Sequence, residues 1–199
     1  MPGRALRLVA GCMLLGLGVA FMVIARLGLS PWDVLHQGVA RHTGMQIGTA
    51  GIVVGLVVLG LWVPLRQRPG VGTLVNVVIV GVTIDGVLAL AGEVHGAAAQ
   101  WAFLVAGLVA IAAGTGLYVG AGLGPGPRDG LMTSMSARFG RSMGRVRTAI
   151  ELAVLGLGWL LGGRVGPGTL VFAVAIGPLV QLFLGYLTLP IPTLTTPSE

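Results

Sequence analysis

Two aspartates occupy equivalent places in two copies of one short motif. Asp33 ends the run L-G-L-S-P-W-D at residues 27–33, and Asp129 ends the run L-G-P-G-P-R-D at residues 123–129, 96 positions later. Each aspartate follows a proline by two residues, which is the spacing of an acidic side chain in the first turn of a helix. A carboxylate there can cap the unpaired N–H groups of the helix, or it can bind a solute that approaches the helix start.

The motif predicts a helix start in both copies. Ser30 is the expected N-cap and Pro31 the first helical residue, and Gly126 and Pro127 take those places in the second copy. Glycines precede both starts and close both short helices, at Gly28, Gly124, Gly44 and Gly140. The residues between Pro and Asp, Trp32 and Arg128, adjoin the two carboxylates. We therefore take both as candidate binding residues together with Asp33 and Asp129.

Three further polar side chains lie within apolar stretches. Asp85 has Gln181 as its counterpart 96 residues later, and Glu151 lies in a third stretch. A carboxylate in hydrocarbon costs roughly 2.5 kcal/mol or more, so it normally faces a cavity or a partner. We predict that all three bind substrate or couple an ion. The structural alternatives are an ion pair with Arg147 for Glu151, and a buried hydrogen bond or a protonated carboxyl for Asp85.

The composition indicates the class of protein that must position these residues. Hydrophobic residues make up 55% of the 199-residue chain, charged residues make up 9%, and the mean hydropathy is +0.95. These values predict an integral membrane protein, because a membrane span needs about 20 apolar residues. Six such stretches can be placed, near residues 6–25, 47–65, 71–90, 101–122, 146–163 and 167–187.

The repeat extends far beyond the opening motif. A shift of 96 aligns residues 8–88 with residues 104–184 without a gap, and the matches include L-V-A-G, V-L-G-L and G-x-G-T-L-V. Each copy holds three spans, an odd number, so the second copy must start on the opposite side of the membrane. We predict an all-α membrane domain of six transmembrane helices in a 3+3 inverted repeat, residues 1–95 and 96–199.

Each repeat also contains the short helix that follows its Pro-x-Asp motif. Two placements are open for these helices. They lie flat in the interface as amphipathic anchors, or they re-enter the bundle and bring both helix starts toward the membrane centre. In the second case the two carboxylates offset the positive helix ends, and a cation or a polar neutral solute is favoured over an anion.

The basic residues predict orientation. All twelve are arginines, and nine of them fall on the amino-terminal side of the six-span arrangement, leaving Arg26, Arg41 and Arg164 on the other. The positive-inside rule then places both termini in the cytoplasm. The bilayer is the expected partner. No nucleic-acid partner is expected, because the net charge of +6 has no aromatic platform beside it. Formation of a homo-oligomer is left open.

The spacing of polar residues shows no enzyme signature, and we expect no catalytic residue, cofactor or metal site. Inverted repeats are typical of secondary transporters, so we predict a small-solute transporter or permease working by alternating access. The alternatives are a non-transporting accessory or structural membrane protein that binds a partner and, less favoured, an intramembrane enzyme.

The motifs also resemble a known group of proteins. These motifs are R-L-G-L-S-P-W-D-V-L-H-Q-G-V-A-R-H-T-G at 26–44, I-G-T-A at 47–50 and G-P-G-P-R-D-G-L-M-T at 124–133. They are similar to those of the YczE/YitT-type family of small bacterial membrane proteins. The resemblance covers nearly the whole chain, and it implies a multi-pass protein of the bacterial plasma membrane. It implies no particular substrate.

Overall fold

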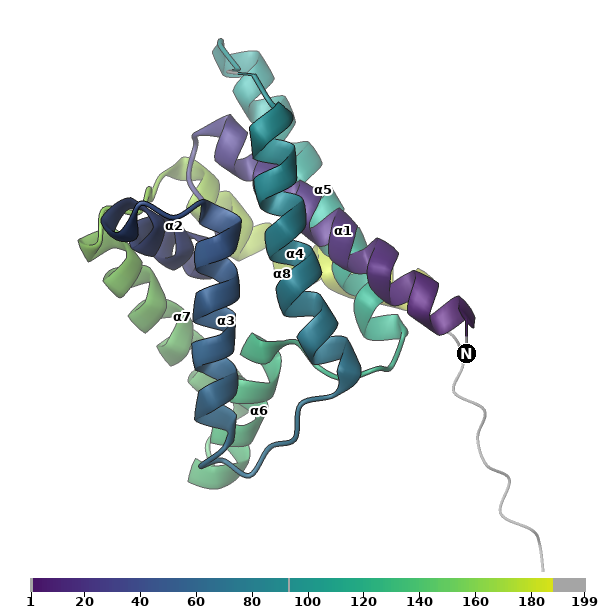
Figure 1. Cartoon of the computed structure of the whole chain (residues 1–199). Helices are drawn as coiled ribbons and strands as arrows, with labels where there is room; N and C mark the ends of the chain where they lie inside the picture. The colour runs from purple at the N-terminus through teal and green to yellow at the C-terminus, as the bar shows by residue number, and fades with distance from the viewer. Residues whose placement is uncertain (1, 93, 188–199) are drawn as a thin grey trace, which may run out of the picture.

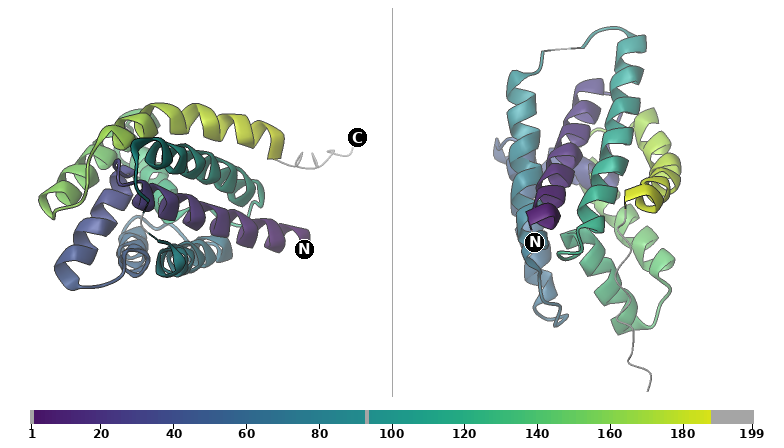
Figure 2. Two further views of the ribbon diagram at one scale, coloured as in Figure 1. Left: turned by 90° about the horizontal axis from the view of Figure 1, so that it is seen from above. Right: turned by 90° about the vertical axis from the view of Figure 1, so that its right-hand side faces the viewer.

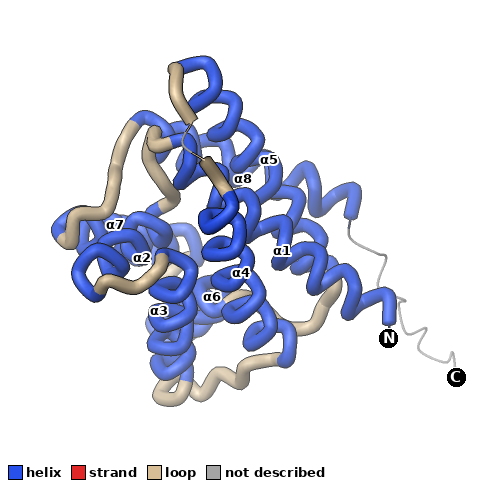
Figure 3. Tube along the Cα trace, turned by 45° about the horizontal axis from the view of Figure 1, so that its top comes forward, coloured by secondary structure: helices blue, strands red, loops and turns tan. Residues whose placement is uncertain are grey.

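The computed structural model describes residues 2–92 and 94–187, and the described residues form helices and loops without a strand (Figure 3). Glu93 and residues 188–199, which the sequence assigns to the outer loop and to the end of the second repeat, lie outside the described residues. The helices follow one another along the chain (Figure 1) as α1 (Pro2–Ala25), α2 (Pro31–Thr43), α3 (Ile47–Trp62), α4 (Val71–Leu90), α5 (Ala97–Gly120), α6 (Pro127–Phe139), α7 (Met143–Leu160) and α8 (Pro167–Leu187).

The order of helices repeats after four elements. α2 and α6, α3 and α7, and α4 and α8 begin 96 residues apart, and α1 and α5 begin 95 residues apart. Contacts between the halves repeat as well, because α2 packs on α7 while α6 packs on α3. The two halves therefore share their local structure and exchange equivalent contacts.

α1 and α5 lie side by side, between α4 and α8 (Figure 2). Gly18 faces Gly107, and Gly11 faces Gly114, and these two pairs are related by the 96-residue shift. A Cβ on Gly18 would lie 2.6 Å from the Gly107 oxygen, and a Cβ on Gly114 would lie 2.7 Å from the Gly11 oxygen. The two backbones are thus in direct contact, a form of helix packing common in membranes.

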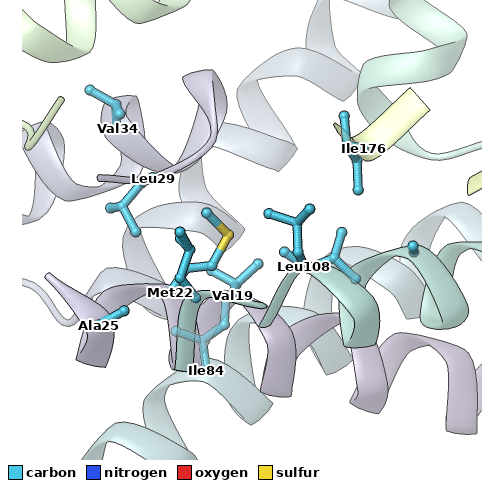
Figure 4. Packing of buried hydrophobic residues seen from close by; sticks show 11 residues of the cluster. Val19, Met22, Ala25, Leu29, Val34, Ile84, Leu108 and Ile176 are labelled. Atoms are coloured by element: carbon cyan, nitrogen blue, oxygen red, sulfur yellow. The ribbon is translucent and has the colours of Figure 1, made fainter. Parts of the chain in front are cut away.

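Buried apolar side chains gather where α1 and α5 meet the other helices (Figure 4). Met22 and Leu104 are almost completely buried there, and α2, α4 and α8 each add a side chain, namely Val34, Ile84 and Ile176. Most of the outward side chains are apolar too. Leu170 and Val174 on α8 are 72% and 78% exposed, as expected for a surface that contacts lipid rather than water.

Four helices are long and apolar enough to cross a membrane: α1, α4, α5 and α8. α2 and α3 together would provide a fifth span, although they bend by 110° where they join. α3 alone has 16 residues, about 24 Å of helix, which is less than a typical hydrocarbon core. α7 has 18 residues but carries Arg145, Arg147 and Glu151. The chain is therefore an all-helical membrane protein with several apolar spans.

Candidate functional site

The Pro-x-Asp motifs begin α2 and α6. Pro31 is the first residue of α2, and Ser30 is its N-cap with extended backbone and a side chain that accepts from the Asp33 N–H at 3.3 Å. Pro127 begins α6 behind an equally extended Gly126. Both short helices end at a glycine in the left-handed conformation, Gly44 and Gly140. Local capping chemistry explains the start of α2 and both ends, whereas α6 begins with its proline alone and has no side-chain cap.

The turn before each short helix is held by the opposite half. The Gly72 N–H at the start of α4 donates to the Leu123 oxygen at 2.9 Å, and the Gly168 N–H at the start of α8 donates to the Leu27 oxygen at 2.8 Å. These bonds are equivalent under the 96-residue shift. Gly28 and Gly124, inside the two turns, have φ of +119° and +127°, a backbone conformation that favours glycine. The two helix starts are therefore fixed relative to each other.

Both starts face one cavity of about 450 Å³. Its walls come from α2 to α8, with one residue of α1, and most lining side chains are apolar. Six of the seven residues predicted to bind substrate or couple an ion line it: Trp32, Asp33, Arg128, Asp129, Glu151 and Gln181. The convergence of α2 and α6 on one interior cavity favours the re-entrant placement of these helices over flat interfacial anchors.

Asp33 lies in a nearly closed polar cluster. Its side chain is 5% exposed, its Oδ2 accepts a short hydrogen bond from the Ser30 hydroxyl, and its Oδ1 lies 3.2 Å from Nδ1 of His36. Arg128 reaches across from α6, with a guanidinium nitrogen 3.4 Å from Oδ1. The same guanidinium lies 5.2 Å from the centre of the Trp32 ring, within the range of a cation–π contact. Asp33 is thus a bridge between the two helix starts.

Asp129 has none of these contacts, although it is the counterpart of Asp33. Its carboxylate has no hydrogen bond or ion pair within the part of the chain that the structure describes, and the residue is exposed toward the cavity. The sequence explains the difference. Gly126 replaces the capping serine, so no hydroxyl is available, and Met132 stands where the first repeat has His36. The Asp33 carboxylate is therefore fully hydrogen-bonded, whereas the Asp129 carboxylate has no hydrogen-bond or ion-pair partner among the described residues.

Asp85, the seventh predicted residue, does not line the cavity. It accepts from the backbone N–H of Gly48 at 2.6 Å and from the backbone N–H and hydroxyl of Thr49 at 2.7 and 2.8 Å. It therefore caps the start of α3 from α4 and ties the two helices together. This matches the hydrogen-bonded alternative for Asp85. Its counterpart Gln181 is exposed on the cavity wall.

The two halves differ most in how the helix that carries Asp85 or Gln181 packs against the preceding helix. α3 packs against α4, and Gly48 and Gly81 are in direct backbone contact there. The equivalent helices α7 and α8 make no more than marginal contact. A Cβ on Gly144, the counterpart of Gly48, would meet no atom within 4 Å. The cavity is consequently closed between α3 and α4 and open between α7 and α8.

Glu151 lies on the open wall, paired with Arg147 one turn earlier at 2.9 Å. Both side chains are partly exposed, so the pair contributes little to stability. This ion pair is the structural alternative given above for Glu151. A role of Glu151 in binding stays a prediction.

Two further residues are functional candidates that the sequence does not single out. Tyr118 is 3% exposed and lines the cavity, and its hydroxyl has no hydrogen-bond partner among the described residues. His36 lines the cavity beside Asp33, and its place in the sequence does not predict this. A tyrosine in an apolar helix normally indicates packing. Only its closeness to the turn at 122–127, which is rich in helix-breaking residues, indicates another role. Among the described residues, no group of three His, Cys, Asp or Glu side chains could hold a metal ion.

Comparison with known proteins gives the chain a family. A protein of Haemophilus influenzae described as uncharacterized is 39% identical over 86% of this chain and 78% of its own length. The uncharacterized membrane protein YczE of Bacillus subtilis is 34% identical over 88% and 82%, and the uncharacterized protein YyaS of the same species is 26% identical over 87% and 89%. No solved structure matches. The resemblance to YczE is confirmed, and residues 3–185 match the model of a family of unknown function, DUF6198, to which the chain belongs.

Proposed function

We propose that this chain is a small-solute transporter of the bacterial plasma membrane that works by alternating access between two inverted repeats. The observation that carries the proposal is the asymmetry of the cavity, which is closed between α3 and α4 and open between the equivalent helices α7 and α8. Two related halves in unlike conformations around one polar site are what alternating access requires. A bundle duplicated only for stability has no need of such a cavity.

In this proposal α3 and α7 complete the membrane crossings, giving six spans. α2 precedes α3 on the outer side, and α6 precedes α7 on the inner side. With both termini in the cytoplasm, as the arginines predict, Asp85 lies toward the outside and Gln181 toward the cytoplasm. The cavity then faces the cytoplasm.

The opposite state follows from the repeat. Exchanging the conformations of the halves would separate α3 from α4 and bring α7 against α8. In the present state a Cβ on Gly55 would lie 3.7 Å from Cβ of Val77, which is a spacing suited to a disulfide. The counterparts of these residues are Glu151 and Ala173, and in the opposite state they should take up that spacing.

Disulfide trapping tests the proposal without knowledge of the substrate. In membranes, and with the only native cysteine removed by Cys12→Ala, the Gly55→Cys/Val77→Cys variant should cross-link rapidly under mild oxidation. The Glu151→Cys/Ala173→Cys variant should cross-link more slowly, as the minor state is visited. A quadruple variant should form one bond or the other in each molecule. Failure of the second pair to cross-link under any oxidation time would indicate a static bundle, as expected for an accessory protein.

A further inference from the structure

Resting on the proposed transport function, we infer that the solute is a small, singly protonated organic amine, bound by Asp129 and Tyr118 beside Gly126. Besides Tyr118, the ionisable residues that line the cavity are three carboxylates, two guanidiniums and one imidazole: Asp33, Asp129, Glu151, Arg128, Arg147 and His36. With a neutral imidazole their formal sum is −1, so one positive charge would balance the cavity.

The excess charge belongs to Asp129. Arg128 lies beside Asp33 and Arg147 is paired with Glu151, which leaves the Asp129 carboxylate without an ion pair among the described residues. An unpaired carboxylate facing a largely apolar cavity attracts a cation. Gly126 explains why Asp129 lacks such a partner. A serine at this position would supply a hydroxyl like that of Ser30, which bonds to Asp33 in the other repeat.

Tyr118 provides the second, independent feature. A Cβ placed on Gly126 would lie 3.1 Å from the Tyr118 hydroxyl and 3.3 Å from Oδ2 of Asp129, so the two oxygens flank the same small space. The hydroxyl is buried and has no partner within the described part of the chain, which costs free energy unless a ligand bonds to it. A carboxylate and a hydroxyl around one vacant space suit an ammonium group, which has three donors to place.

Trp32 indicates what else the solute carries. Its indole Nε1 is buried and has no partner in residues 2–92 and 94–187, and the residue lines the same cavity. Because this nitrogen can only donate, it would bond to a hydroxyl or carbonyl oxygen of the solute. A metal ion suits the site poorly, because hard cations need six or more oxygen ligands and the walls here are mostly apolar. The cavity volume is within the range of small-molecule sites.

Binding of a defined amine panel tests the inference. Methylammonium, ethanolamine and isobutylamine would be titrated into the purified protein at constant ionic strength, with binding followed by calorimetry and by the unfolding temperature. Ethylene glycol and isobutanol, the uncharged isosteres, serve as ligand controls. We expect saturable binding of at least one amine and of neither alcohol. Absence of charge-dependent binding across the panel would overturn the inference.

Four variants locate the site. Asp129→Asn should weaken amine binding by about tenfold or more, since it removes a charged hydrogen-bond acceptor. Gly126→Ser should also weaken it, because the new hydroxyl occupies the space and bonds to Asp129. Arg138→Gln, which removes a charge from the same helix outside the cavity lining, is the control, with affinity unchanged within about threefold. Tyr118→Phe separates binding from structure, since it should weaken binding while leaving the unfolding temperature of the free protein unchanged or raised.

The two proposals can fail separately. Amine binding that survives Asp129→Asn unchanged would overturn the site, whatever the cross-links show. Amine binding lost in Asp129→Asn but without cross-linking of the Glu151→Cys/Ala173→Cys pair would retain the binding site and overturn transport. Cross-linking of that pair in a protein that binds no amine would retain alternating access and overturn the substrate class.

Discussion

Replacing Asp85 by asparagine should release α3 from α4. Asp85 accepts three hydrogen bonds, from the backbone N–H of Gly48 and from both the backbone N–H and the hydroxyl of Thr49. The carboxylate also faces the positive end of α3. Asparagine keeps a single, uncharged acceptor oxygen and places an amide N–H₂ against a backbone donor, so the cap is weakened.

The magnitude follows from these contacts. Hydrogen bonds to a charged group contribute about 1.5–3 kcal/mol, and the helix end adds about 0.3–1 kcal/mol. Because the clamp is only partly buried, we take the lower limit, about 1.5 kcal/mol, and assign it to the state closed between α3 and α4. The equilibrium between the two states should then shift about tenfold toward the opposite state.

The assay is the labelling rate of a cysteine that this closure buries. Val77 on α4 packs against Gly55, is 7% exposed and lines the cavity. In a Cys12→Ala/Val77→Cys background, Asp85→Asn should raise the rate of modification by an impermeant maleimide added outside by about tenfold. Thr49→Val removes one of the three bonds and should give a smaller increase. An unchanged external rate, in a protein that is nonetheless less stable, would refute the clamp and leave Asp85 as a structural cap.

Two further predictions concern the aspartate pair and the topology. Asp33→Asn should lower the free energy of unfolding by about 2 kcal/mol, or the unfolding temperature by roughly 4–8 °C, because it breaks a buried cluster. Asp129→Asn, which has no partner to lose among the described residues, should change the free energy of unfolding by no more than about 0.5 kcal/mol. Equal losses in the two variants would contradict the difference between the two aspartates. Single cysteines at Ala98 and Arg141 should react with impermeant maleimide from outside and from the cytoplasm respectively, and labelling of both from one side would rule out the inverted repeat.

The sequence predicts the short helices well because their signals are local. Proline fixes the start of α2, and a glycine in the left-handed conformation fixes its end, so Pro31 and Gly44 carry the information within one helix length. The boundaries of the longer helices also follow from hydropathy. The number of crossings does not, because α3 has only 16 residues and α2 meets it at a bend of 110°.

The polar contacts within the cavity depend on residues far apart in the chain. Asp85 caps a helix that begins 38 residues earlier, and Arg128 reaches an aspartate in the other repeat. The repeat suggests that Asp33 and Asp129 are equivalent, yet Gly126 in place of Ser30 makes one free and the other saturated. Such a difference appears only once the partners of each carboxylate are placed in space. No local sequence pattern predicts that α7 and α8 stand apart.

The distance between α7 and α8 tests the central claim most directly. Spin labels on Arg145→Cys and Leu182→Cys, in a Cys12→Ala background reconstituted in lipid, report the opening between these helices, since both residues are exposed near it. We expect two distance populations, a major long one and a minor short one, and Asp85→Asn should increase the short one about tenfold relative to the long one. A single long distance that Asp85→Asn leaves unchanged would contradict alternating access.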